Sequence, residues 1–252
     1  MNRKTILIAA LGSLAPLAAQ WNNYPTPGIP RLANGKANLD APPPRTPDGK
    51  PGLEGVWRAE GALLLLNLAS GGIQVPFQPW AEEVYEQRRS DRGLHDPEAQ
   101  CLPQGTPKMG TLPWPFKIIN TPGMVLILYE TNNLFRQVFT DGRKLPVDPN
   151  PTWLGYSIGH WEGDEFVVET NGLSERMWLD TNGHPHTEAL HVFERFRRPD
   201  FGHMVIDITI DDPKAYTRPW TFPLRTRFLP DADLLEFICN ENNNPSAKHM
   251  QK

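Results

Sequence analysis

The densest group of side chains able to transfer protons or bind metals lies between Asp180 and Arg195. This stretch reads DTNGHPHTEALHVFER and holds three of the chain's seven histidines. Imidazole is the side chain whose ordinary pKa lies closest to neutrality, and a neighbouring carboxylate can orient it for proton transfer. The segment therefore predicts a binding or catalytic site.

Within this segment we expect acid–base chemistry. His186 is the expected base or acid, and His184 and Asp180 lie beside it in sequence. His191 and Glu194 complete the set of catalytic candidates. A histidine oriented by a carboxylate can catalyse an elimination or isomerisation without a cofactor, and hydrolysis is the nearest variant. An alternative stays open in which these residues only hold a loop by hydrogen bonding.

The same histidines also offer a set of metal ligands. His184, His186 and Glu188 share one face of a strand, whereas His184, Glu188 and His191 align on a helix. Either set supplies two imidazoles and one carboxylate, which zinc accepts with one position open for water. The spacing matches no established metal signature, so we expect neither a metal nor another cofactor.

Further polar and aromatic residues are candidates for contact with a ligand. They are Tyr129, Arg136, Trp161, Arg195 and Glu236. A carboxylate inside a β-barrel is costly unless it is paired or used, which draws attention to Glu236 and Glu194. An arginine could instead neutralise either carboxylate and leave no function.

The first residues indicate export. A charged start is followed by a short apolar run that ends at Ala19, which predicts a signal peptide over residues 1–19, too short to span a bilayer. We therefore expect a periplasmic or secreted protein without a membrane span. Removing residues 1–19 takes away Arg3 and Lys4, which leaves 23 basic and 29 acidic residues and a net charge of −6. This charge argues against nucleic acid as a partner.

The rest of the chain has the pattern of an all-β protein with one amphipathic helix, expected over residues 79–92. Met204, Ile206, Ile208 and Ile210 alternate with more polar residues, as in a strand with one buried face. After a first strand that starts near Leu53, the expected strands are 116–120, 124–129, 134–140, 156–161, 165–170, 191–196, 204–210, 222–228 and 234–239.

About nine strands joined by hairpins must avoid open edges, and closure removes them. We therefore expect a single antiparallel β-barrel domain over residues 53–245 with an internal cavity. Residues 20–52 are expected to form a proline-rich extended arm, residues 97–115 a loop packed on the barrel, and residues 246–252 a disordered tail. In an exported protein Cys101 and Cys239 can close a disulfide, although two buried thiols are the alternative.

Several motifs also carry a resemblance. Gly55-x-Trp57 resembles the start of lipocalins and other calycin barrels, in which the tryptophan plugs the closed end. A broader likeness joins Cys101-Leu-Pro-Gln-Gly, Thr140-Asp-Gly-Arg143, Ser157-Ile-Gly-His-Trp-Glu-Gly-Asp164, Gly183-His-Pro-His186, Glu194-Arg195 and Asp211-Asp-Pro213. These motifs resemble a large group of secreted bacterial proteins of mostly unassigned function. The resemblance implies a secreted lipocalin-like barrel and no particular activity.

Three classes of function follow, and the first two take a small organic molecule as partner. An acid–base enzyme, a lyase, isomerase or hydrolase, predicts at least one of the three histidines inside the barrel beside a carboxylate. A carrier of an apolar or aromatic molecule predicts a cavity with these histidines outside it. An envelope interaction module would use the proline-rich arm and need no cavity.

Overall fold

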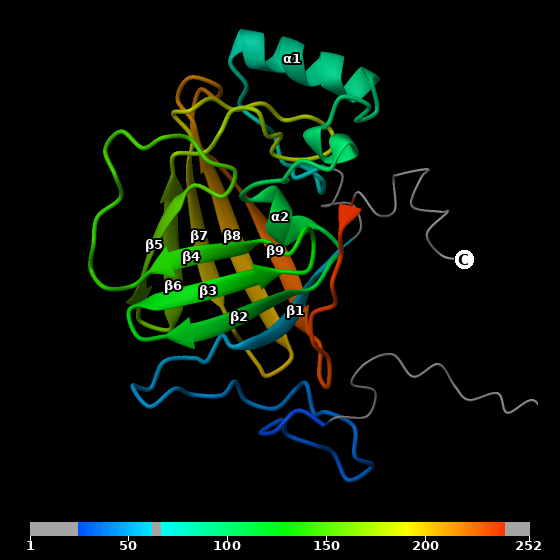
Figure 1. The fold of residues 1–252 in the computed structure, drawn as a ribbon, viewed down its shortest axis with the longest axis vertical. Helices are drawn as coiled ribbons and strands as arrows, with labels where there is room; N and C mark the ends of the chain where they lie inside the picture. Colours follow the sequence, from blue (N-terminus) through cyan, green and yellow to red (C-terminus); the bar gives the residue numbers. More distant parts are fainter. Residues whose placement is uncertain (1–24, 62–66, 240–252) are drawn as a thin grey trace, which may run out of the picture.

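The computed structural model of the chain describes residues 25–61 and 67–239 (Figure 1). The expected signal peptide over 1–19, the expected tail over 246–252 and residues 240–245 of the expected barrel domain lie outside the described residues. In the part that is described, no helix is long and apolar enough to cross a membrane.

Nine strands among the described residues close into a barrel in the order in which they occur in the chain. Because β9 pairs with β1, the ring is complete, which confirms the expected all-β class and the closure. The strands are β1 (Gly55–Glu60), β2 (Phe116–Thr121), β3 (Met124–Tyr129), β4 (Phe135–Phe139), β5 (Tyr156–Glu162), β6 (Glu165–Asn171), β7 (His191–Arg197), β8 (His203–Asp211) and β9 (Trp220–Phe228).

The expectation of an antiparallel barrel was wrong for one pair of neighbouring strands. β4 pairs with β5 in parallel, whereas the other eight neighbouring pairs are antiparallel. In a closed ring of antiparallel strands the directions must alternate, which is possible only for an even number of strands. Nine strands therefore force at least one parallel pair. Residues 140–155 form the long connection between β4 and β5, visible as the wide green loop in Figure 1.

The strand expected over residues 234–239 was also wrong. These residues form no strand, and Phe237 makes only an isolated bridge to Thr131. The physical reason lies in the closure itself. β9 already pairs with β8 on one side and with β1 on the other, so it leaves no open edge for another strand.

Alternation along the strands fills the barrel with apolar side chains, as expected. Met204, Ile206, Ile208 and Ile210 of β8 are all at most 3% exposed. Burial of side chains of this size is the main favourable term in folding.

Trp57 lies completely buried in the core, where its Nε1 donates to the Leu53 carbonyl at 3.0 Å. The Arg198 guanidinium carbon lies 4.7 Å from the centre of the Trp57 ring, and burial lowers the pKa of Arg198 to about 10. Gly55 has a φ of +127°, and a Cβ there would lie 2.3 Å from the Phe228 ring. The positive φ and the close Phe228 ring explain why a glycine stands at this position.

Residues 25–52 form no helix or strand and run below the barrel in Figure 1, in blue. Arg45 pairs with Asp164 in the turn between β5 and β6, and Arg31 pairs with Asp231 after β9. Backbone amides of Phe201 and Gly202 donate to carbonyls of this arm.

Two helices and a 3₁₀ turn lie near the opposite end of the barrel. The expected amphipathic helix is present as α1 (Pro79–Ser90), which starts at a proline and buries Ala81 and Tyr85. The loop expected over residues 97–115 contains the 3₁₀ turn Pro97–Gln100 and the short helix α2 (Lys108–Thr111). A disulfide joins Cys101 to Cys239, which decides between the two alternatives for the cysteines.

Candidate ligand site inside the barrel

Two charged residues face the inside of the barrel, and strand alternation places them there. β7 buries Val192, Glu194 and Phe196, and β4 buries Arg136 and Val138. Glu194 is 5% exposed and Arg136 3%. Charged side chains are rarely buried to this degree without a partner, so their surroundings matter.

Arg136 and Glu194 form a bidentate ion pair. The Nη2–Oε2 distance is 2.5 Å and the Nη1–Oε1 distance is 3.2 Å. Arg136 also donates to Ser157 Oγ at 3.0 Å and to Thr170 Oγ1 at 2.6 Å. A buried pair is tolerated when hydrogen bonds satisfy both ions in this way.

At neutral pH Arg136 and Tyr129 each keep a single protonation state. Burial, the largest single effect, lowers the pKa of Arg136, but the charge of Glu194, the Tyr129 hydroxyl and the hydrogen bonds to both together raise this pKa above its ordinary value. Burial raises the pKa of the Tyr129 hydroxyl beside them. Arg136 is therefore charged and Tyr129 neutral. General acid–base catalysis favours a pKa near the working pH, so these two groups are better suited to hydrogen bonding than to proton transfer.

A small cavity of about 20 Å³ adjoins this pair. Its polar edge is Tyr129, Arg136 and Glu194. The apolar part of its wall consists of Phe116, Ile127, Phe196, Ile206, Ile208 and Leu224. A volume of this size holds about one water molecule.

The cavity is covered by the segment 101–115, which we term the plug. Thr106, Pro107 and Gly110 of the plug line the cavity, and the plug's Met109 is 2% exposed. Gly105 has a φ of +74°, and a Cβ there would lie 2.7 Å from the Trp153 carbonyl oxygen. The plug therefore packs closely on the chain around the barrel mouth.

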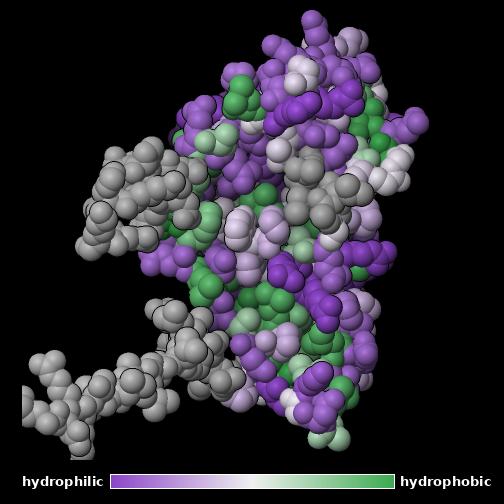
Figure 2. All heavy atoms as spheres, turned by 90° about the vertical axis from the view of Figure 1, so that its right-hand side faces the viewer, coloured by the Kyte–Doolittle hydropathy of each residue, from purple (hydrophilic) through white to green (hydrophobic). Residues whose placement is uncertain are grey.

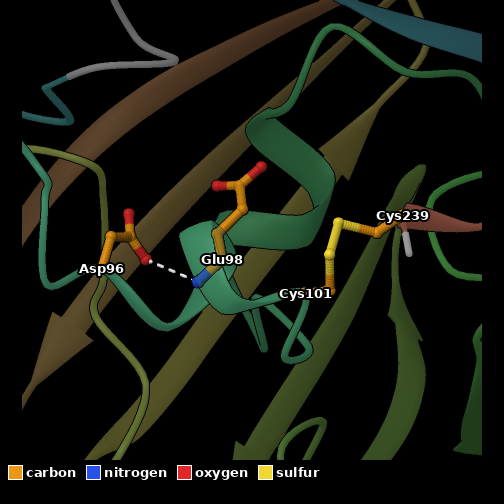
Figure 3. The surroundings of a disulfide bond; sticks show 4 residues. All are labelled: Asp96, Glu98, Cys101 and Cys239. Carbon is orange, nitrogen blue, oxygen red and sulfur yellow. Dashed lines mark hydrogen bonds between the residues drawn. A yellow bond between two sulfur atoms is a disulfide. The ribbon is translucent and has the colours of Figure 1, made fainter. Parts of the chain in front are cut away.

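A buried lysine fixes the fold of the plug. Lys108 is 1% exposed and its Nζ contacts Asp96 and, at 3.0 Å, Glu98. Asp96 also accepts from the Glu98 amide at 3.1 Å (Figure 3). Asp96 caps the 3₁₀ turn just before the plug and Glu98 lies within this turn. The ion pairs therefore hold the segment 96–108 together and do not attach it to the barrel wall.

His184 and Asp180 form a close pair near α1, outside the barrel cavity. His184 Nδ1 lies 2.6 Å from Asp180 Oδ2, and the ring centre lies 4.3 Å from that of Tyr85. Burial would raise the pKa of Asp180, but the charge and hydrogen bond of His184 and backbone amides lower it overall. Asp180 accepts from the backbone amides of Leu68, Gly183 and His184. The pair thus holds a loop, and it also has the geometry of an oriented imidazole.

The remaining histidine candidates do not join this pair into one site. His186 is buried, its Nδ1 lies 3.0 Å from the Thr187 carbonyl, and burial lowers its pKa. His191 is half-buried and stacks on Phe193, and Glu188 is exposed. In residues 25–61 and 67–239, no three histidines, cysteines or carboxylates are grouped so that they could hold a metal ion.

The other expected ligand contacts lie outside the cavity. Arg195 is exposed and pairs with Glu162 at 2.7 Å and Glu165 at 3.1 Å. Trp161 is half-buried and packs on Phe166. The expectation that Glu236 stands in a buried strand was wrong, because its segment is no strand and Glu236 is exposed.

Sequence reasoning missed Ser157 and Thr170, which complete the hydrogen bonds of Arg136. Both occupy buried positions, Ser157 in β5 and Thr170 in β6, but burial does not alternate strictly along either strand, so the sequence pattern gave only a weak signal. Lys108 gave no such signal, because the plug has no periodic pattern.

The fold and the site together define a closed nine-stranded β-barrel with a buried ion pair beside a plugged cavity. No family model matches the chain, and no curated protein matches it.

Proposed function

We propose that the protein is a lipocalin-like carrier that binds a small apolar or aromatic molecule inside its barrel, in the periplasm or outside the cell. The observation that carries this proposal is the cavity under the plug, where an apolar wall meets a polar edge. Ligand pockets commonly combine such a wall with a few polar groups that fix orientation.

The polar edge defines the chemistry of the ligand. Glu194 neutralises Arg136, so the pair adds no net charge to the cavity. An anionic ligand would meet the Glu194 carboxylate, and a charged ligand of either sign would lose its hydration in an apolar space. A neutral molecule with a hydroxyl or amide group, such as a phenol, fits best, because it can hydrogen bond to Glu194 or Tyr129.

The position of the histidines favours a carrier over an acid–base enzyme. Neither His184 nor His186 lines the cavity, and Glu194, which does, is held by Arg136. A carboxylate engaged by two guanidinium hydrogen bonds is a poor general base, because protonation would break its ion pair.

The ligand requires withdrawal of the plug. A cavity of about 20 Å³ is far below the roughly 300–1,000 Å³ of drug-sized sites. The plug contributes no strand to the barrel, so its displacement breaks no hydrogen bond between strands.

The test is a fluorescence titration with the neutral apolar probe N-phenyl-1-naphthylamine. We expect saturable binding by the wild-type protein. Ile208→Phe fills the cavity and should weaken binding at least tenfold, whereas Thr209→Phe, the next residue on the outer face, should leave it unchanged. Absence of saturable binding, or equal effects of the two substitutions, would overturn the proposal.

An acid–base enzyme is the second candidate, and the Asp180–His184 pair is the observation that favours it. A carboxylate 2.6 Å from Nδ1 fixes the orientation of the ring, as a general base requires. A lyase or isomerase of this kind would need its substrate to reach His184 past Phe77 and Tyr85, which cover the ring.

A further inference from the structure

We propose that the Cys101–Cys239 disulfide is a redox latch that holds the plug over the barrel mouth. Reduction by a dithiol would release the plug and open the interior. That reduction opens the plug is inferred from the contacts of the disulfide, the plug and the barrel. Only the effect of this opening on ligand binding rests on the proposed function.

The residues after β9 run along the plug and contact both of its ends. We term residues 231–239 the strap. Cys239 of the strap is bonded to Cys101, the first residue of the plug (Figure 3). Near the other end of the plug, Phe237 stacks on Trp114 with ring centres 4.9 Å apart.

The barrel anchors the strap. The Leu235 amide donates to Glu130 Oε2 at 3.0 Å, and Phe237 bridges to Thr131, both just beyond β3. Since Glu130 is only 8% exposed, this anchor is partly shielded from water. The disulfide therefore connects the start of the plug covalently to a segment fixed on the barrel.

Without the disulfide, only non-covalent contacts would hold the start of the plug, where Gln104 and Thr106 are at most 4% exposed. The amide and hydroxyl of Thr106 reach the carbonyls of Trp153 and Leu154 at 3.4 Å each, which is long for a hydrogen bond. The ion pairs of Lys108 lie within the segment 96–108 and can move with it.

The disulfide lies at neither a fully buried nor a fully exposed position. Both cysteines are half-buried. The face over β1 and the strap shows apolar patches between polar side chains (Figure 2), and Trp114, Leu235 and Ile238 are among the exposed apolar residues.

The chemistry is thiol–disulfide exchange. A thiolate of the dithiol attacks one sulfur and releases the other cysteine as a thiolate, which takes up a proton. The second thiol of the reductant then attacks the mixed disulfide and releases the first cysteine. Two electrons pass to the protein, which gains two thiols, and the reductant becomes a cyclic disulfide.

Trypsin cleavage at two buried sites of this chain measures whether the plug opens. Lys108 in the plug is 1% exposed, and Arg136 in the barrel is 3% exposed. Cleavage after Lys108 requires the plug to open, whereas cleavage after Arg136 requires the barrel to open. Mass spectrometry of early digests gives both rates, with and without dithiothreitol.

We expect reduction to accelerate cleavage after Lys108 at least tenfold relative to cleavage after Arg136. In the oxidised protein, Phe237→Ala should raise the same ratio severalfold, and its neighbour Ile238→Ala should not. If both sites accelerate in equal proportion, the disulfide only stabilises the whole fold and the proposal is overturned. If reduction accelerates cleavage at neither site, the proposal is overturned as well.

The same samples separate this proposal from the proposed function. With N-phenyl-1-naphthylamine, we expect the association rate to rise at least tenfold on reduction. Plug opening without any probe binding would support the latch and reject the carrier. Probe binding at an equal rate in both redox states would support the carrier and reject the latch as its gate.

Discussion

The stability of the barrel interior depends strongly on the charges of Arg136 and Glu194 and on their attraction. Taking both charges out of water costs several kcal/mol per ion, which the ion pair and the bonds to Ser157 and Thr170 offset. Either charge alone would be left buried without a counter-ion.

Removing one charge should therefore be far more harmful than removing a surface charge. We expect Glu194→Gln to lower the free energy of unfolding by about 3–5 kcal/mol. The next residue supplies the control, because Arg195→Met breaks only exposed ion pairs and should cost less than about 1 kcal/mol. Urea unfolding measures both, and similar losses in the two variants would contradict this account.

His186 should make stability depend on pH. Its folded pKa lies below 6.5, with burial as the largest cause, so the unfolded chain binds a proton more readily. Its contribution is complete above about pH 6.5 and is lost as the pH falls through the folded pKa, with a slope of at most about 1.4 kcal/mol per pH unit.

We expect His186→Gln to flatten the fall in unfolding free energy between pH 7 and pH 5. Urea unfolding at several pH values measures the slope. The wild-type protein, unfolded under the same conditions, gives the reference slope. A His186→Gln protein with that same slope would show that the imidazole does not cause it.

At the scale of elements, two glycines of the plug test how tightly it is seated. Gly105 has a positive φ and faces Met177 and the Trp153 carbonyl, whereas a Cβ at Gly110 would meet nothing within 4 Å. Gly105→Ala should destabilise the plug by about 2–4 kcal/mol through strain and overpacking. Gly110→Ala should be neutral or stabilise by up to about 1 kcal/mol.

The measurement is again tryptic cleavage after Lys108 relative to Arg136. We expect a large increase for Gly105→Ala and none for Gly110→Ala. Equal cleavage ratios in the two variants would mean that the contacts of Gly105 do not seat the plug.

Several strands could be predicted from the sequence because they bury one face with a two-residue period. β8 and β9 follow this period over their whole length. The segment 234–239 looked equally apolar, but local pattern does not say whether a sheet edge remains open. The parallel pair depends on the number of strands in the closed ring, which is a property of the whole sheet.

The candidate site was predictable only in part, for a related reason. Glu194 and Arg136 were identified as candidates, and alternation places both inside. The dense histidine segment was the strongest signal in the sequence, yet its side chains do not form one site. Asp180, His184 and His186 lie in a loop, where no helix or strand period determines which way a side chain points. Hydrogen bonds across the fold determine where such loop residues point.

At the scale of the whole molecule, closure joins distant parts of the chain. Residues of β1 pair with residues of β9, so Arg58 lies opposite Arg227. The disulfide spans 138 residues in sequence, and the arm contacts the turns between β5 and β6 and between β7 and β8. Contacts of such long range slow folding, because loops must close before the contacts form.

The one parallel pair also makes the barrel mechanically uneven. β4 and β5 are paired at two positions, Val138 with Ser157 and Phe139 with Ile158, whereas β8 and β9 are paired at eight. Arg136 crosses this short seam with its hydrogen bond to Ser157 and continues to Thr170 and Glu194 on the next two strands. The Arg136 side chain thus connects β4 to β5, β6 and β7, where few backbone hydrogen bonds join β4 to β5. Under a pulling force we expect the barrel to open first between β4 and β5.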